Sequence, residues 1–196
     1  MKTALVTKPA DVPVSLTEVK SHLNVDHTND DFLIDGYVSA AVTQVENILN
    51  RKLITQTWKV FFDDWPDEYF ITPFGKVQSV TSVKYKDTAG TESTLAVTEY
   101  IVDTYADPGR IVLGYNKSWP TTELYPSNPI TIQYVCGYGD ADDVPGPIKS
   151  AILLMVGDFY AHRESVVIGN AIMMAEVPGY ITNLLASYRL WDGFND

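Results

Sequence analysis

Apolar positions along the 196-residue chain follow two different periods. In the first part, apolar residues recur at steps of three and four residues: Leu33, Tyr37, Ala40, Ala41, Val45, Ile48 and Leu49. This spacing predicts an amphipathic helix that begins at Thr28 and runs for about six turns. A shorter helix is expected before it, because Ser15 and Glu18 have the spacing of a capping box. We expect that helix to end near Asn24.

The middle of the chain changes to a strand-like pattern. Six runs rich in Val, Ile, Thr, Phe and Tyr show partial alternation, and they cover residues 58–65, 68–74, 77–85, 99–105, 110–115 and 130–138. Turn signals at 87–90 and 107–109 separate some of them. Because no helical pattern lies between these runs, we expect an antiparallel sheet, either a meander or a small barrel. A polar, proline-rich loop at 116–129 is long enough to suggest a function or a partner contact.

The last part returns to the helical period. One predicted helix is apolar on nearly all faces and carries Ile148, Ile152, Met155 and Phe159, so we expect it in the middle of the fold. A final helix is expected to carry Ile181, Leu184, Leu185, Tyr188 and Trp191. The whole pattern predicts an α+β fold. Its N- and C-terminal parts, residues 1–54 and 140–196, form a helical bundle, and an antiparallel β subdomain, residues 55–139, is inserted between them.

The net charge of the chain disfavours some classes of binding partner. The chain has 14 basic and 25 acidic residues and a net charge of −11. This balance disfavours nucleic-acid binding and anionic membrane surfaces, which both need clustered Lys and Arg. The basic residues look scattered along the sequence, with only Lys84 and Lys86 on a shared strand face. The apolar run at 151–156 is too short to span a bilayer, so we expect no membrane contact and a cytosolic location where the protein is made.

One segment resembles catalytic machinery. Residues 136–149 read CGYGDADDVPGPIK, which combines a strand end, two glycines and three acids, Asp140, Asp142 and Asp143. The acids would repel phosphate, and they lack the spacing and the distal Glu of a calcium loop. We therefore interpret the segment as a strand end followed by a helix that begins at Pro145 or Pro147.

A metal-dependent hydrolase remains an alternative hypothesis for these acids. It would use Asp140, Asp142 and Asp143 together with one of the three histidines, which are His22, His27 and His162. The sequence contains neither H-E-x-x-H nor G-x-S-x-G, and its single cysteine, Cys136, excludes an intramolecular disulfide and a thiolate metal cluster. We predict no catalytic, cofactor-binding or metal-binding residue and no cofactor.

The order of several motifs resembles a known family. Residues 15–58 read SLTEVKSHLNVDHTNDDFLIDGYVSAAVTQVENILNRKLITQTW, and the later runs at 77–95, 100–112 and 136–164 follow in the order of tailed-phage head–tail connector proteins, also called adaptor or head-completion proteins. The resemblance covers about residues 15–191. It implies helices interrupted by a β insertion, and copies that form a ring below the capsid portal. That ring would continue the DNA channel toward the tail.

The resemblance also implies partners. They are other copies of the chain, the portal protein and a stopper or tail-completion protein, in the virion neck after assembly in the host cytoplasm. The genome would pass through the ring without specific binding. A stopper or tail-completion role for the chain itself is the nearest alternative. Ring contacts are heterologous, and we expect candidate interface residues toward the C-terminal end: Val166, Val167, Met173, Met174, Tyr188, Trp191 and Phe194.

Overall fold

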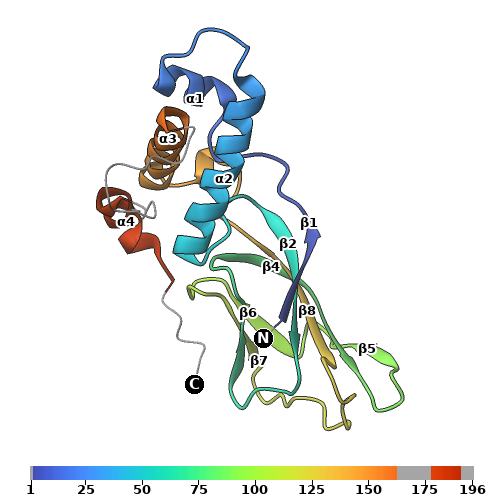
Figure 1. Ribbon diagram of the computed structural model, residues 1–196. Coiled ribbons are helices and arrows are strands. Elements are labelled where there is room, and N and C mark those ends of the chain that lie inside the picture. Colours follow the sequence, from blue (N-terminus) through green and yellow to red (C-terminus); the bar gives the residue numbers. More distant parts are fainter. Residues whose placement is uncertain (1, 163–177, 191–196) are drawn as a thin grey trace, which may run out of the picture. The chain divides into compact units, whose positions relative to one another are not determined.

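The computed structural model describes residues 2–162 and 178–190, and it has a mixed α+β fold (Figure 1). The chain divides into two compact units. The β unit comprises residues 1–10 and 54–138, and the helical unit comprises residues 11–53 and 139–196. The expected fold class and the antiparallel pairing of the strands are confirmed.

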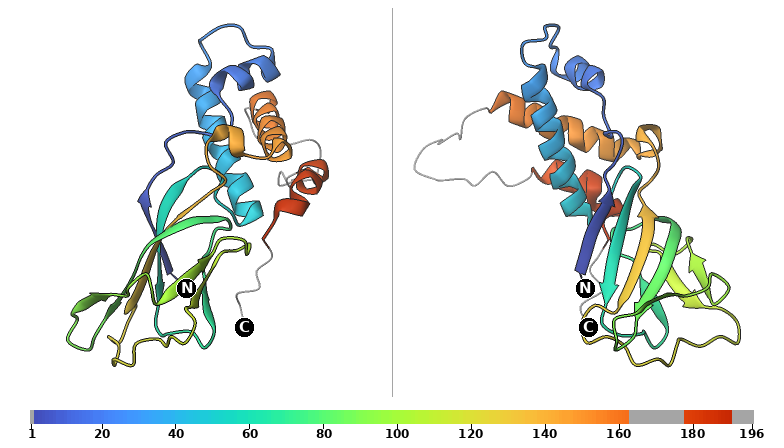
Figure 2. Two further views of the ribbon diagram at one scale, coloured as in Figure 1. Left: turned by 180° about the vertical axis from the view of Figure 1, so that it is seen from behind. Right: turned by 90° about the vertical axis from the view of Figure 1, so that its right-hand side faces the viewer.

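The β unit contains two antiparallel sheets. The first has the order β1-β2-β8-β4-β5, formed by Lys2–Thr7, Gln56–Phe62, Ile130–Cys136, Val77–Lys86 and Glu92–Thr94. The right-hand view of Figure 2 shows β1, β2, β8 and β4 side by side in that order. The second sheet has the order β3-β7-β6, formed by Tyr69–Ile71, Arg110–Leu113 and Tyr100–Asp103. All six strand runs expected from the sequence form strands, and β1 and β5 are additional.

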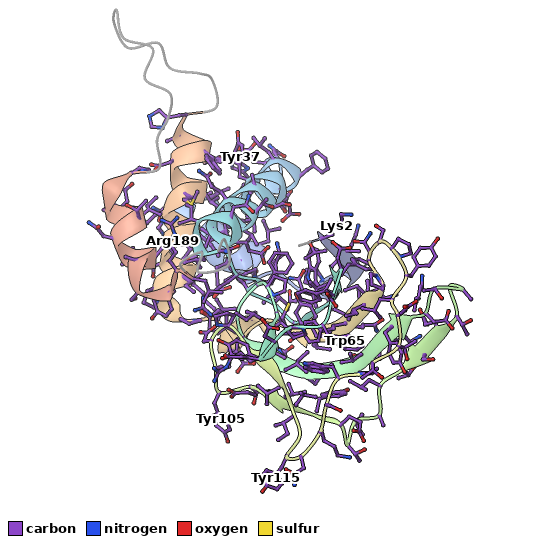
Figure 3. The ribbon with its side chains drawn as sticks, turned by 90° about the horizontal axis from the view of Figure 1, so that it is seen from below. Lys2, Tyr37, Trp65, Tyr105, Tyr115 and Arg189 are labelled. Carbon is purple, nitrogen blue, oxygen red and sulfur yellow. The ribbon has the colours of Figure 1, made fainter. Side chains whose placement is uncertain are left out.

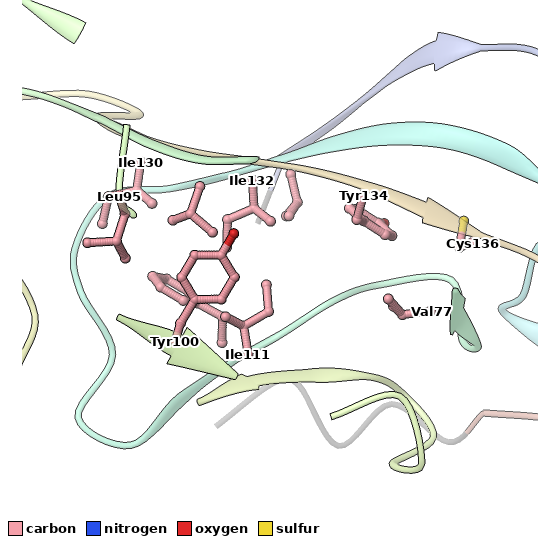
Figure 4. Close-up of a cluster of buried hydrophobic side chains, with 11 residues drawn as sticks. Val77, Leu95, Tyr100, Ile111, Ile130, Ile132, Tyr134 and Cys136 are labelled. Atoms are coloured by element: carbon pink, nitrogen blue, oxygen red, sulfur yellow. The ribbon is translucent and has the colours of Figure 1, made fainter. Parts of the chain in front are cut away.

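The core of the β unit lies between the inner faces of these sheets. Along β8, Ile130, Ile132, Tyr134 and Cys136 are buried, and the alternate residues are half-buried. They pack with Phe70, Tyr100 and Ile111 of the second sheet (Figure 4). Strict alternation of this kind gives each strand of the first sheet an inner and an outer face. The outer face matters for the surfaces described below.

Strand β1 corrects the expectation that residues 1–54 are helical. Lys2–Thr7 pairs antiparallel with β2, with Lys2 opposite Phe61 and Ala4 opposite Lys59. The six residues of β1 are too few to show a clear period, and most of them are exposed. They become a strand because the edge of β2 offers unpaired backbone groups, and β2 is about 50 residues away in the sequence.

The helical unit is built from α1 (Leu16–Leu23), α2 (Asp31–Leu49), η1 (Ala141–Asp143), α3 (Gly146–Ala161), α4 (Gly179–Leu185) and η2 (Ala186–Tyr188). The expected capping box is present: the N–H of Ser15 donates to Glu18 Oε2 at 2.7 Å, and the N–H of Glu18 donates to Ser15 Oγ at 3.2 Å. The Ser15 hydroxyl also donates to Glu18 Oε2 at 2.7 Å, and the two hydrogen bonds that this carboxylate accepts from the N–H and hydroxyl of Ser15 hold the pKa of Glu18 below its usual value. Helix α1 ends at Asn24 as expected, with a left-handed C-cap.

Helix α3 packs against α1, α2 and α4. The buried face of α2 is centred one residue away from the predicted stripe, since Ile34 and Val38 are buried and Leu33 and Tyr37 are half-buried. Helix α2 also begins at Asp31 and not at Thr28. The residue before it, Asp30, accepts a 2.6 Å hydrogen bond from the Tyr160 hydroxyl of α3. None of the helices in the described ranges is long and apolar enough to cross a bilayer.

Candidate interaction surfaces

The segment at 136–149 is a structural turn in which both glycines are needed for backbone reasons. Gly137 and Gly139 have φ values of 119° and 146°. A Cβ on Gly137 would lie 2.6 Å from the carbonyl oxygen of Ile54, and a Cβ on Gly139 would collide with the Asp143 carboxylate. Neither glycine therefore needs a phosphate ligand to explain its presence.

The aspartates of the same segment are engaged locally. The N–H of Asp140 donates to Asp143 Oδ2 at 3.0 Å, and the N–H of Asp143 donates back to the carbonyl of Asp140 at 3.1 Å. Helix α3 follows with Pro147 in its first turn, as the sequence interpretation predicted. The exposed Asp142 lies 3.9 Å from Lys149 Nζ.

The hydrolase hypothesis finds no ligand set in the described part of the chain. No three His, Cys, Asp or Glu side chains within residues 2–162 and 178–190 gather in a metal-binding arrangement. The exposed His22 and His27 lie on α1 and in the loop after it. His162 caps the end of α3, with its Nδ1 3.1 Å from the Asp158 carbonyl oxygen.

We predict that Gly137→Ala lowers the free energy of unfolding by about 2 kcal/mol or more. An alanine at a φ of 119° is strained, and its methyl group would press on the Ile54 carbonyl. Denaturant unfolding of the two proteins measures the difference. Gly36→Ala is the matched control, because no atom lies within 4 Å of the position of its Cβ and it sits inside helix α2. We expect that change to be neutral or stabilising, and equal stability of wild type and Gly137→Ala would contradict this account.

The C-terminal candidate interface is described only in part. Tyr188 is half-buried at the end of η2, and its carbonyl accepts a hydrogen bond from Arg51 Nε at the end of α2. The N–H of Leu190 donates to the Leu49 carbonyl at 2.9 Å. These bonds fix residues 188–190 on α2, and the last helix stops at Leu185 instead of running to Trp191. The other candidates lie outside the described residues: Val166, Val167, Met173, Met174, Trp191 and Phe194.

The long loop at 116–129 is anchored on the β unit. The N–H of Tyr125 donates to the Lys86 carbonyl at 3.0 Å, and Leu124 forms a bridge with Asp87. Trp119 stacks on Trp65 with ring centroids 5.1 Å apart. A shallow hollow of about 480 Å³ lies between this loop and residues 63–65. We find no group in the hollow that points to a particular ligand.

Two tyrosines in other loops of the β unit are almost fully exposed. Tyr105, between β6 and β7, is 100% exposed, and Tyr115, after β7, is 90% exposed. Both point outward from the loops that carry them (Figure 3). Beside them, the outer face of the three-stranded sheet carries Ile101, which is also exposed. The sequence placed both tyrosines at the ends of predicted strand runs, 99–105 and 110–115, and the strands in fact end two residues earlier, at Asp103 and Leu113.

A basic face on the five-stranded sheet also escaped the sequence analysis. Strand register places Lys2, Lys59, Lys84 and Lys86 on the outer face of β1, β2 and β4. Lys84 Nζ bonds Glu92 Oε1 at 2.7 Å, and this bond lowers the pKa of Glu92, with smaller contributions from the nearby Lys86 and Lys59. The strand face that Lys84 and Lys86 were expected to share is confirmed, whereas the expectation that the other basic residues are scattered is wrong for Lys2 and Lys59. Residues 2, 59 and 84 are distant in sequence, and only the pairing of their strands brings them together.

Comparison with known proteins gives one family. A family model described as "HCP: Head completion protein" matches residues 14–191. A search of curated proteins finds no match. Among solved structures, a chain from "Neck of empty GTA particle computed with C6 symmetry" has a TM-score of 0.78 at 19% identity, with 96% of this chain and 95% of that chain covered.

Two further structures have the same coverage. A chain from "Virion of native gene transfer agent (GTA) particle" has a TM-score of 0.76 at 19% identity, and covers 96% of this chain and 95% of that one. A chain from "Neck of native GTA particle computed with C12 symmetry" has a TM-score of 0.74 at 21% identity, again with 96% and 95% covered. At these identities the likeness establishes a shared fold across both units.

Proposed function

This chain belongs to the head completion protein family, and we propose that its copies form a ring that connects the capsid portal to the tail. The ring would continue the DNA channel through the neck of the particle. The observation that carries the proposal is the family match, because it spans residues 14–191 and so includes both units. The fold likeness to chains from particle necks, determined with C6 and C12 symmetry, supports it.

The proposed ring has three kinds of partner. Neighbouring copies meet by heterologous contacts, the portal lies on one side, and a stopper or tail-completion protein lies on the other. We assign the portal contact to the C-terminal end, where residues 188–190 are fixed on α2. We also infer that the helical unit is a bundle, because α3 packs against three other helices. Assembly takes place in the host cytoplasm, and the finished protein sits in the virion neck.

The genome is proposed to pass through the ring without specific binding. A net charge of −11 per copy, repeated around a ring, gives a negative field that repels phosphate. Weak contact would suit a channel, since tightly bound DNA could not slide out. No enzymatic step is assigned to the chain, and the described residues hold the Asp140–Asp143 turn in a structural role.

Deletion of the gene that encodes this protein tests the proposed role. We expect filled heads and free tails that do not join, and a loss of infectious particles that the gene supplied in trans restores. In electron micrographs, those heads should lack one ring of density below the portal. Purified protein mixed with purified portal should migrate with it as a complex.

Different outcomes would separate the alternatives. Co-migration with the tail terminator but not with the portal would assign the chain to a stopper or tail-completion position. Normal tailed particles after deletion would overturn the neck role altogether. A truncation before Ser187 should prevent portal binding if the C-terminal end carries that contact. Circular dichroism of the truncated protein checks that the helices remain folded.

A further inference from the structure

Charge is divided unequally between the two units of the chain. The β unit, residues 1–10 and 54–138, has eight basic and ten acidic residues and a net charge of −2. The helical unit, residues 11–53 and 139–196, has six basic and fifteen acidic residues and a net charge of −9. Both units are net negative, so attraction between copies needs a local positive surface, and the nearly neutral β unit is the one that can provide it.

The basic face on the five-stranded sheet provides such a positive surface, and we call it the lysine face; it carries Lys2, Lys59, Lys84 and Lys86. Its lysines lie on adjacent rows: Lys2 is opposite Phe61, Lys59 is opposite Gln133, and Lys84 is opposite Thr131. With strands spaced about 4.8 Å apart, β1 and β4 are separated by roughly 15 Å, so the four ammonium groups can act on one partner surface. Among the strand positions that face outward with these lysines, Glu92 of β5 is the one acidic residue, and it lies opposite Lys86.

Three of these lysines are available for a partner. Within the described residues, Lys2, Lys59 and Lys86 form no ion pair, whereas Lys84 is paired with Glu92. The rest of the face is mostly polar, with Ala4, Phe61 and Val135 as apolar positions; its polar residues include Thr57, Ser82, Thr131 and Gln133. No other element of the β unit covers this face, because the second sheet packs on the inner one.

The helical unit presents a surface of the opposite kind. Asp26, before α2, and Asp35, in its second turn, are exposed and form no ion pair with any described residue. Between them Phe32 is 92% exposed, although it is a large apolar side chain on a helix. By contrast, Asp31 is engaged with Lys20 at 2.7 Å. The start of α2 therefore combines two available carboxylates with one exposed aromatic ring.

We propose that the lysine face of one copy binds the acidic, Phe32-bearing start of α2 on the neighbouring copy. The contact rests on the proposed ring function and names the surfaces that close it. The lysines pair with Asp26 and Asp35, and Phe32 lies on the apolar position Phe61, which is opposite Lys2. The two surfaces are on different units, so the contact is heterologous, as a closed ring requires. Duplex DNA is the less suitable occupant, because the −11 charge of the chain opposes it and the face holds no arginine.

Charge reversal on each side, alone and together, tests this contact. Lys59→Glu/Lys86→Glu should weaken ring assembly by at least ~10-fold, and so should Asp26→Lys/Asp35→Lys. The four changes combined should restore it, because attraction is re-established with the signs exchanged. Lys8→Glu/Lys76→Glu is the matched control, since it makes the same charge change outside the face. Assembly is measured by native mass spectrometry and electron microscopy, with the protein alone and with purified portal, in low and high salt.

Each outcome has one meaning. If the Lys59→Glu/Lys86→Glu variant forms rings as well as the wild type does, this contact is overturned and the proposed function stands. The same conclusion follows if the combined variant does not recover ring assembly. A wild-type protein that forms no ring, alone or with portal, overturns the proposed function and the contact with it. Fluorescence anisotropy with a duplex oligonucleotide adds one more arm. If the wild type binds the oligonucleotide and the Lys59→Glu/Lys86→Glu variant does not, the lysine face is a nucleic-acid site, and the proposed contact is overturned.

Discussion

Tyr134→Ala is expected to lower the free energy of unfolding by about 3–5 kcal/mol. Tyr134 is fully buried in β8 at the centre of the β unit (Figure 4). Removing its ring leaves a cavity among closely packed neighbours and also removes the hydrogen bond from its hydroxyl to the Pro73 carbonyl, 3.0 Å long. Because small domains are stable by only about 5–15 kcal/mol, much of the total would be lost. Denaturant titration measures the change.

The adjacent residue Val135 provides the control for this experiment. It belongs to the same strand but lies on the outer face and is half-buried. Val135→Ala should cost less than about 1 kcal/mol, because little packing is lost there. Similar losses for Tyr134→Ala and Val135→Ala would contradict the assignment of inner and outer faces.

Tyr134→Phe removes the hydroxyl and keeps the ring, so it separates their contributions to the free energy of unfolding. Burial raises the pKa of Tyr134 well above its ordinary value, and the nearby Cys136 raises it further. Above about pH 10 the unfolded chain loses a phenolic proton that the folded chain keeps, so this contribution to stability is complete below pH 10 and declines as pH rises. Wild type should therefore lose stability between pH 10 and 11 more steeply than Tyr134→Phe, by up to about 1.4 kcal/mol per pH unit. Parallel slopes would show that the hydroxyl is accessible to solvent.

The second large effect is expected in the helical unit, where Ile152→Ala should cost about 2–5 kcal/mol. Ile152 is fully buried on α3, the helix that contacts α1, α2 and α4. Leu154→Ala on the same helix is the control, because Leu154 is half-buried and should cost less. Far-ultraviolet circular dichroism follows the helices during unfolding. Equal losses at the two positions would mean that α3 does not occupy the centre of this unit.

Local sequence signals predicted many elements well. The capping box of Ser15 and Glu18, the end of α1 at Asn24 and the alternation along β8 are all as expected. Each depends on residues within a few positions of one another, so the sequence carries the full information. The structural role of the 136–149 turn was predicted in the same way, because glycines, acids and prolines have local conformational preferences.

The sequence by itself determined most of the helices and six of the strands and, through the order of its motifs, the family. Tertiary structure alone decided the features that need distant partners. Strand β1 exists because β2 can pair with it, and the buried face of α2 is centred on Ile34 because of how α3 packs there. The lysine face is the plainest example. Lys2, Lys59 and Lys84 share it only through the register of four strands, and a shift of one residue in any pairing would turn a lysine to the opposite face.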